Sequence, residues 1–183
     1  MMIRQSENQR LGDTSGFTLI EMLVVVIILG ILAMIIVPQI TVSTGDARLN
    51  TLQTNLNTLR SAVEVYAAQH INRYPGTYKE TDGTSPVATD LEAHDAFIAQ
   101  LTQYTDINGK VATVKDTTFK YGPYIKLGKF PTNPFNENND VACDFDENDI
   151  TAARVSDGSG KGWRYFAPIG VFFANDSDAH AAL

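Results

Sequence analysis

The sequence predicts an α+β protein in which a long N-terminal α-helix packs on a small antiparallel β-sheet head with a long C-terminal loop. Three patterns support this prediction: an apolar run at residues 17–38, an amphipathic helical pattern at residues 39–72, and short strand-like runs within residues 73–183. The 183 residues are 19% charged and 44% hydrophobic, as in globular proteins. Helical periodicity followed by separate strands is typical of the α+β class.

The apolar run is long enough to cross a lipid bilayer. Residues 17–37 contain a single charged side chain, Glu21, and one other polar side chain, Thr18. As an α-helix this run would span about 31 Å, close to the roughly 30 Å of a hydrocarbon core. We therefore expect a transmembrane helix over residues 17–38. A carboxylate at membrane depth costs a few kcal/mol, so Glu21 is a candidate functional residue that needs a partner.

The residues before the apolar run are predicted to be a leader. A secretory signal has basic residues beside its apolar region and a small-residue cleavage site after it. Here the small and polar sequence GDTSG precedes the run at residues 12–16, and no such cleavage site follows the run. A signal anchor is the simplest alternative. Because the small residues lie before the run, processing there would leave the helix attached.

A second helical pattern follows the apolar run. Pro38 and Gly45 predict a kink or local break, because proline lacks the backbone N–H and glycine favours helix poorly. Beyond the break, apolar residues recur at steps of three and four, which predicts an amphipathic helix that packs on the head. They are Leu49, Leu52, Leu56, Leu59, Val63 and Tyr66. Asn72, Pro75 and Gly76 are expected to end this helix.

The head is predicted to contain one short helix and several strands. Thr89 and Glu92 form a capping-box pattern at the start of the helix. Its apolar face would consist of Leu91, Phe97, Ile98, Leu101 and Tyr104. Strands are expected at residues 110–114 and 119–126, and a hairpin at residues 162–175 around a turn at Pro168 to Gly170. Residues 131–161 are predicted to be a long loop.

The N-terminal pattern resembles the prepilin signature of type IV pilins and of the pseudopilins of type II secretion. The resemblance rests on Gly16, the sequence FTLIE at residues 17–21, and the apolar run that follows. It implies a pilin-like fold, cleavage after Gly16 by prepilin peptidase, and methylation of the new amine of Phe17. It also implies that Glu21 sets the subunit register in a filament. Its partner would be the N-terminal amine of the same chain or of an adjacent subunit; alternatively, Glu21 stays hydrated near the membrane interface.

Two segments of the head also resemble the major pseudopilins. They are YGPYIKLGKFPTNPFN at residues 121–136 and GKGWRYFAPIGVFFAND at residues 160–176. Many pilins of extracellular pili close this region with a disulfide, whereas this chain has one cysteine, Cys143. The lone cysteine favours a pseudopilin. We expect Cys143 to be a small, partly buried residue, with a disulfide between subunits as the alternative.

The long loop is rich in acidic residues that could bind a hard cation such as Ca²⁺. The candidate ligands are Asp140, Asp144, Asp146, Asp149 and Asp157. An EF-hand is excluded, because Asp149 stands where the loop needs glycine and Val155 where it needs glutamate. Major pseudopilins bind calcium in this region, so the resemblance makes Ca²⁺ a possible cofactor. A solvated acidic loop is the alternative.

The sequence favours a structural subunit over an enzyme. His70, His94 and His180 have no neighbouring nucleophile motif, and the net charge of −7 without clustered Lys or Arg argues against nucleic-acid binding. The resemblance implies a helical homopolymer. It implies as partners the prepilin peptidase and methyltransferase, an inner-membrane platform protein, an assembly ATPase, minor pseudopilins and the lipid bilayer.

The resemblance also implies a location. The chain would span the inner membrane once, with its head in the periplasm, and would then assemble into a periplasmic pseudopilus for protein secretion. An extracellular type IV pilus for adhesion, motility or DNA uptake is the first alternative. A membrane-anchored monomeric binding module, with Gly16 uncut and Glu21 dispensable, is the second.

Overall fold

The computed structural model describes residues 16–183, apart from the side chains of residues 35–43 and Leu127. Residues 1–15 of the predicted leader lie outside the described residues. The chain forms two compact units, Met1–Thr44 and Gly45–Leu183. The second unit therefore combines the amphipathic part of the N-terminal helix with the head.

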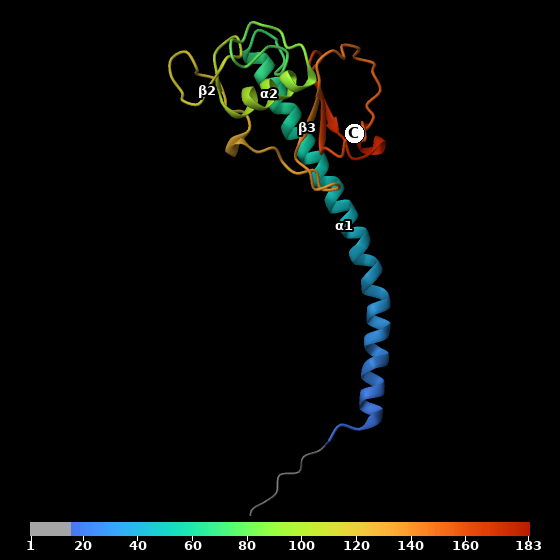
Figure 1. The fold of residues 1–183 in the computed structure, drawn as a ribbon. Coiled ribbons are helices and arrows are strands. Elements are labelled where there is room, and N and C mark those ends of the chain that lie inside the picture. The colour runs from blue at the N-terminus through green and yellow to red at the C-terminus, as the bar shows by residue number, and fades with distance from the viewer. Residues whose placement is uncertain (1–15) are drawn as a thin grey trace, which may run out of the picture. The chain divides into compact units, whose positions relative to one another are not determined.

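Helix α1 (Leu19–Gln69) is a single helix of 51 residues (Figure 1). The helical backbone continues through Pro38 and Gly45, so the predicted local break is corrected, and the alternative of a kink stays a prediction. Proline removes one backbone donor, and the hydrogen bonds of the neighbouring turns suffice to continue the helix. The helix ends where Ile71 and Asn72 adopt positive φ angles of 58° and 56°.

The predicted membrane span covers residues 17–38, and the side chains of its last four residues, 35–38, are not among those described. Within the described residues, none of the helices combines the length and the apolar character that a membrane crossing requires.

The short helix of the head is confirmed. Helix α2 (Asp90–Thr102) begins after Thr89, whose side chain accepts a hydrogen bond from the backbone N–H of Glu92. Tyr104 does not continue this helix as predicted. It begins strand β1 (Tyr104–Thr105), which pairs antiparallel with β2 (Val111–Ala112) inside the predicted strand at residues 110–114. Leu91 is 69% exposed, so it does not belong to the buried face of α2.

A second sheet has the strand order β3 (Val141–Asp144), β4 (Trp163–Phe166), β5 (Val171–Ala174). The predicted hairpin is confirmed, since β4 and β5 pair antiparallel with Trp163 opposite Ala174. Strand β3 lies inside the predicted loop and pairs parallel with β4, so the prediction of a purely antiparallel sheet is wrong. The long connection between β3 and β4 permits this arrangement, because parallel neighbours need a crossover of a dozen or more residues.

The strand predicted at residues 119–126 is also wrong. Tyr121 forms an isolated bridge with Thr105, and a short 3₁₀ helix, η1 (Lys126–Gly128), follows. Gly122 has a φ of 72° and Pro123 has no N–H, so the backbone leaves the extended conformation there. Near the end of the sequence, α3 (Asp178–Ala181) is a single helical turn with Ser177 as its N-cap.

One hydrophobic core joins the amphipathic part of α1, helix α2 and the β3–β4–β5 sheet. The predicted stripe of α1 supplies buried side chains from Leu52 to Tyr66. Phe97 of α2 packs on Tyr165 of β4, with ring centroids 4.2 Å apart. Trp163 of β4 is fully buried and donates its indole N–H to the carbonyl of Pro131 at 2.8 Å. This core fixes the head on the amphipathic helix, as predicted from the stripe.

Candidate functional site

The predicted cleavage site lies in an open segment before α1. Gly16 has no helical or strand structure, and a Cβ built on it would meet no atom within 4 Å. Phe17 follows with 81% of its surface exposed. The peptide bond between Gly16 and Phe17 is therefore not covered by the described residues and is accessible to a peptidase.

Glu21 forms a capping box with Thr18 at the start of α1. Its Oε2 accepts hydrogen bonds from the backbone N–H and the hydroxyl of Thr18, each at 2.7 Å. In return, the backbone N–H of Glu21 donates to the Thr18 hydroxyl at 3.2 Å. A carboxylate in the first helical turn also interacts favourably with the helix dipole. The glutamate thus has a structural role in its own helix, which the sequence analysis did not assign.

The apolar side chains around Glu21 are exposed on every side of α1. Each large apolar side chain described between Leu19 and Met34 is between 46% and 92% exposed. A contiguous apolar surface of this size is not stable in water. It needs lipid or other protein chains around it.

The five candidate calcium ligands lie in different local structures. Asp144 ends β3 and forms an ion pair with Arg164 at 3.5 Å. Asp149 accepts hydrogen bonds from the backbone and hydroxyl of Thr151. Asp157 instead accepts a hydrogen bond from the side-chain amide of Asn175 at 2.7 Å.

The remaining two candidates, Asp140 and Asp146, are exposed. Across the described part of the chain, no three His, Cys, Asp or Glu side chains lie together so as to hold a metal ion. Asp144 and Asp146 do lie together, and the nearby Asp144 carboxylate raises the pKa of Asp146. Calcium binding by this loop stays a prediction.

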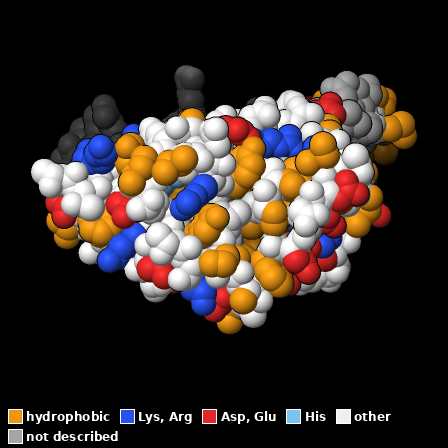
Figure 2. Space-filling view, turned by 90° about the horizontal axis from the view of Figure 1, so that it is seen from above, with side chains coloured by type: hydrophobic (Ala, Val, Ile, Leu, Met, Phe, Trp, Pro, Cys, Tyr) orange, Lys and Arg blue, Asp and Glu red, His pale blue; other side chains and the backbone are white. Residues whose placement is uncertain are grey.

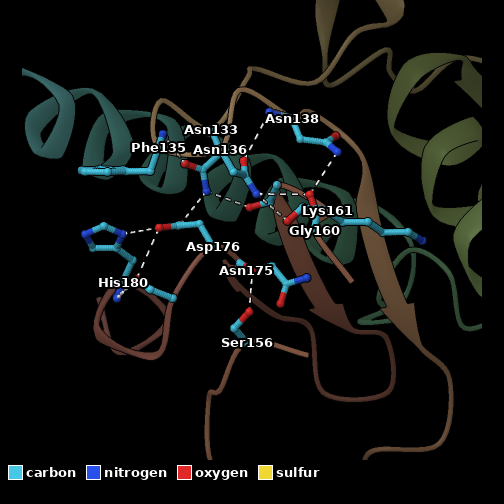
Figure 3. A network of polar contacts seen from close by, with 12 residues as sticks. Asn133, Phe135, Asn136, Asn138, Ser156, Gly160, Lys161, Asn175, Asp176 and His180 are labelled. Atoms are coloured by element: carbon cyan, nitrogen blue, oxygen red, sulfur yellow. Dashed lines mark hydrogen bonds and ion pairs between the residues drawn. The ribbon is translucent and has the colours of Figure 1, made fainter. Parts of the chain in front are cut away.

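A network of asparagines, missed by the sequence analysis, joins the loops of the head (Figure 3). Asn133 is fully buried, and its side-chain amide donates to the carbonyl of Gly162 at 2.9 Å and to the carboxylate of Asp176 at 2.7 Å. Its side-chain oxygen accepts from the backbone N–H of Phe135. Asp176 also contacts His180 of α3. Asn133 therefore links the turn at residues 131–138 to Gly162, just before β4, and to Asp176 near the end of the sequence.

The signal for this network was the asparagine in TNPFN, since asparagine commonly bonds the backbone two residues on. Its long-range partners could not be read from spacing.

Cys143 is buried in the core, and burial raises the pKa of its thiol. Its burial confirms the predicted packing role and argues against a disulfide between subunits.

The chain is similar to a known family and to known proteins. Residues 13–37 match the family model of the prokaryotic N-terminal methylation motif. Over 121 residues the chain is 38% identical to type II secretion system core protein G of Aeromonas hydrophila. The matched region covers 66% of this chain and 67% of that protein. No solved structure matches the chain significantly.

Shorter matches agree with this result. The chain is 40% identical over 63 residues to the protein of the same name from Pseudomonas aeruginosa, or 34% of this chain and 44% of that protein. It is 31% identical over 93 residues to that of Klebsiella michiganensis, or 48% of this chain and 65% of that protein. The chain thus spans less than half of the Pseudomonas relative. The methylation motif and the longer match together show that the chain belongs to the family of type II secretion system core protein G.

Proposed function

We propose that the chain is a pseudopilin that is cleaved after Gly16 and polymerises into a pseudopilus for type II protein secretion. The observation that carries the proposal is the exposed apolar surface between Leu19 and Met34, which lies within the methylation motif of residues 13–37. Subunits that pack these surfaces together would shield them from water. The family match over 121 residues supports the same function.

Cleavage would create the cationic partner that Glu21 needs. The new amine would belong to Phe17, four residues before Glu21, and would be methylated. In the described residues both hydrogen bonds from Thr18 reach Oε2 of Glu21, and Oε1 has no hydrogen-bond partner. Oε1 is therefore free to accept the amine of an adjacent subunit without breaking the capping box. An amine and a carboxylate that pair between chains would fix the register of the growing filament.

The work of assembly would come from partners. We assign cleavage and methylation to the prepilin peptidase, and polymerisation to the platform protein and the ATPase. Before assembly the chain would be anchored in the inner membrane. Minor pseudopilins would belong to the same filament. The head would lie in the periplasm. On the face in Figure 2, Lys and Arg side chains are scattered among acidic and hydrophobic ones, so this face offers no basic patch for nucleic acid.

The mass of the membrane-extracted chain tests the first step. We expect a chain that begins with methylated Phe17 in cells that contain the peptidase, and a chain that begins with Met1 in cells without it. A chain that still begins with Met1 in both strains would contradict the proposal. That result would favour a membrane-anchored monomeric module.

The effect of Glu21→Ala tests the second step. The variant should be cleaved normally, because Gly16 and Phe17 are unchanged, but should lose filaments and secretion. Glu21→Gln serves as a matched control that keeps a hydrogen-bonding side chain and removes the charge. Normal filaments from both variants would rule out the pairing role. Long surface filaments that are dispensable for secretion would instead indicate an extracellular type IV pilus.

A further inference from the structure

One segment of the head unit holds an excess of positive charge. Residues 110–129, here called the lysine segment, contain five of the 14 Lys and Arg residues of the chain and one of its 21 Asp and Glu residues, Asp116. The segment is therefore basic within a chain whose net charge is −7. Its lysines are spread along the segment and do not form a dense cluster. They are Lys110, Lys115, Lys120, Lys126 and Lys129.

The charges of the lysine segment are not neutralised within the chain. All five lysines are exposed, and none of the ion pairs among the described residues includes one of them. Lys120 lies over the ring of Tyr121, with its Nζ 5.2 Å from the ring centroid. The carboxylate of Asp116 accepts from the backbone N–H groups of Thr118 and Phe119, each at 2.7 Å, and so caps its own turn. The ammonium groups therefore remain available to a partner outside this copy.

A second segment of the head unit has the opposite charge. Residues 137–149, here called the acidic segment, contain six Asp and Glu residues and no Lys or Arg. Asp144 is paired with Arg164, and none of the ion pairs in the described part of the chain includes another of the six. Four of the unpaired acidic side chains are exposed, namely Glu137, Asp140, Asp146 and Asp149. The acidic segment as a whole thus lacks cations, as the lysine segment lacks anions.

The fold separates the two segments within the head unit. The lysine segment contains β2 and η1, and the acidic segment contains β3. In Figure 1, β2 lies on one side of α2, whereas β3 and the loop that follows it lie on the other. No ion pair among the described residues joins the two segments, so they do not neutralise each other in one copy. The head unit therefore presents opposite charges in opposite directions.

We propose that the lysine segment of one copy contacts the acidic segment of a second copy in the assembled filament. The proposal rests on the proposed function, since polymerisation brings the two copies together. Charge complementarity favours this partner, because a second copy offers a carboxylate-rich surface on the side away from its own lysines. Such a contact joins two different surfaces and leaves one of each free on the pair. Repeated contacts of this kind build an open helical filament.

Cross-linking of filaments of the unmodified chain identifies the partner of the lysine segment. A carbodiimide joins a lysine amine directly to a carboxylate that touches it. In cells shifted from light to heavy nitrogen during assembly, a cross-link between a light and a heavy peptide must come from two copies. We expect such mixed cross-links to join the lysine segment to the acidic segment. Filaments in which the lysine segment forms mixed cross-links only with other parts of the chain, or none, would overturn the proposal.

Charge reversal in the same cells measures what the contact contributes to assembly. Lys115→Glu combined with Lys126→Glu should lower the yield of sheared filaments about tenfold, because opposite charges across the contact become like charges. Lys115→Arg combined with Lys126→Arg is the matched control, since it keeps both charges and should keep the yield. Equal yields from the two double variants would contradict the contact. If the unmodified chain makes no filaments, the proposed function fails instead, so the two failures are distinguishable.

Discussion

The same helix behaves in opposite ways at its two ends. Between Leu19 and Met34 its apolar side chains are exposed, with Leu29 at 58%, whereas in the head unit Leu56 is 1% exposed. The difference comes from pattern, because the first part is apolar on all faces and the second has one apolar stripe on a polar helix. A stripe is covered by one head, but an apolar surface on every face needs several neighbours. The first part therefore serves assembly and the second serves folding.

Polar groups follow the same division. At the assembly end, Glu21 is bonded by Thr18 at Oε2 alone, so part of its hydrogen-bonding capacity remains for another chain. In the head, the side chain of Asn133 uses both its amide and its oxygen within the chain. We expect changes at the two ends to separate cleanly. Head variants should alter the melting temperature and leave cleavage intact.

The largest effect should come from the aromatic core of the head. Phe97→Ala removes a ring that packs against Phe130, Tyr165 and Phe172, and should lower the free energy of unfolding by about 3–5 kcal/mol. Leu91→Ala on the same helix is the control, since Leu91 is 69% exposed and should change stability by less than about 0.5 kcal/mol. Denaturant unfolding measures both. Similar losses in the two variants would contradict the assigned core.

The next effect should come from the asparagine network. Asn133→Ala leaves the carboxylate of Asp176 and the backbone N–H of Phe135 without their partner, and should cost about 2–4 kcal/mol. Asn139→Ala is a matched control, because Asn139 is exposed in the same loop. Cleavage after Gly16 should be unchanged in both. A loss of cleavage in Asn133→Ala would break the separation between the two ends.

The effect of added calcium on stability tests whether the acidic loop of the head binds Ca²⁺. If the acidic loop binds Ca²⁺, a concentration 100 times Kd should stabilise the head by about 2.7 kcal/mol, because the ion binds the folded chain preferentially. Melting of the full chain in detergent, with calcium or with chelator, measures the shift. Asp146→Asn should then reduce it. An unchanged melting temperature at millimolar calcium would reject the site.

A smaller effect should follow from His70, which is fully buried. Its Nδ1 donates to the carbonyl of Tyr66, and its Nε2 forms a hydrogen bond with the hydroxyl of Thr105 at 2.9 Å. Burial lowers the pKa of His70 below 6.5, although Asp106 acts against this shift. The unfolded chain therefore takes up the proton first.

Stability should accordingly fall as pH drops from about 6.5 toward the lower folded pKa, and no further loss from this group should occur below it. Melting temperatures between pH 7.5 and 5 measure this fall. His70→Gln should flatten it, while His94→Gln, on the partly exposed His94, should not. Equal pH dependence in all three chains would exclude His70 as the source.

Local patterns predicted some elements and failed at others for physical reasons. The stripe from Leu52 to Tyr66, the N-cap of α2 at Thr89 and the β4–β5 hairpin depend on neighbours in sequence, and all three are present. The capping box is only half formed, because the Glu92 carboxylate accepts from the backbone N–H of Ala88 instead of that of Thr89. Strand β3 was missed because its partner β4 is about twenty residues away and its parallel pairing leaves no turn signal. The predicted break at Pro38 failed because one missing donor does not end a long helix.

The candidate site divides in the same way. The N-terminal motif is a short continuous pattern, so it could be recognised from the sequence alone, and the family model confirms it over residues 13–37. The acidic candidates for calcium were grouped by sequence, but folding distributes them, with Asp144 on Arg164 and Asp157 on Asn175. The placement of the lysine segment and the acidic segment on opposite sides of α2 depends on the fold, so spacing could not indicate it.

The smallest expected effect separates the two roles of Glu21. Thr18→Ala removes the hydroxyl that donates to Glu21 and accepts its backbone N–H, but keeps the backbone donor of residue 18. The first turn of α1 should lose about 1 kcal/mol. Thr18→Ser keeps the hydroxyl and should behave as the unmodified chain. Amide exchange of the first turn, measured on the cleaved chain in micelles, reports the cap directly.

Filament yield then shows how the cap and assembly are linked. If the capping box only orients Glu21, Thr18→Ala should lower the yield a few-fold, because the carboxylate spends less time in position for the amine of an adjacent subunit. The effect should be much weaker than that of Glu21→Ala, which removes the carboxylate itself. A loss as complete as in Glu21→Ala would mean that Thr18 takes part in the contact between chains. The assembly end would then need two side chains for its polar contact, and the free Oε1 of Glu21 would not be sufficient.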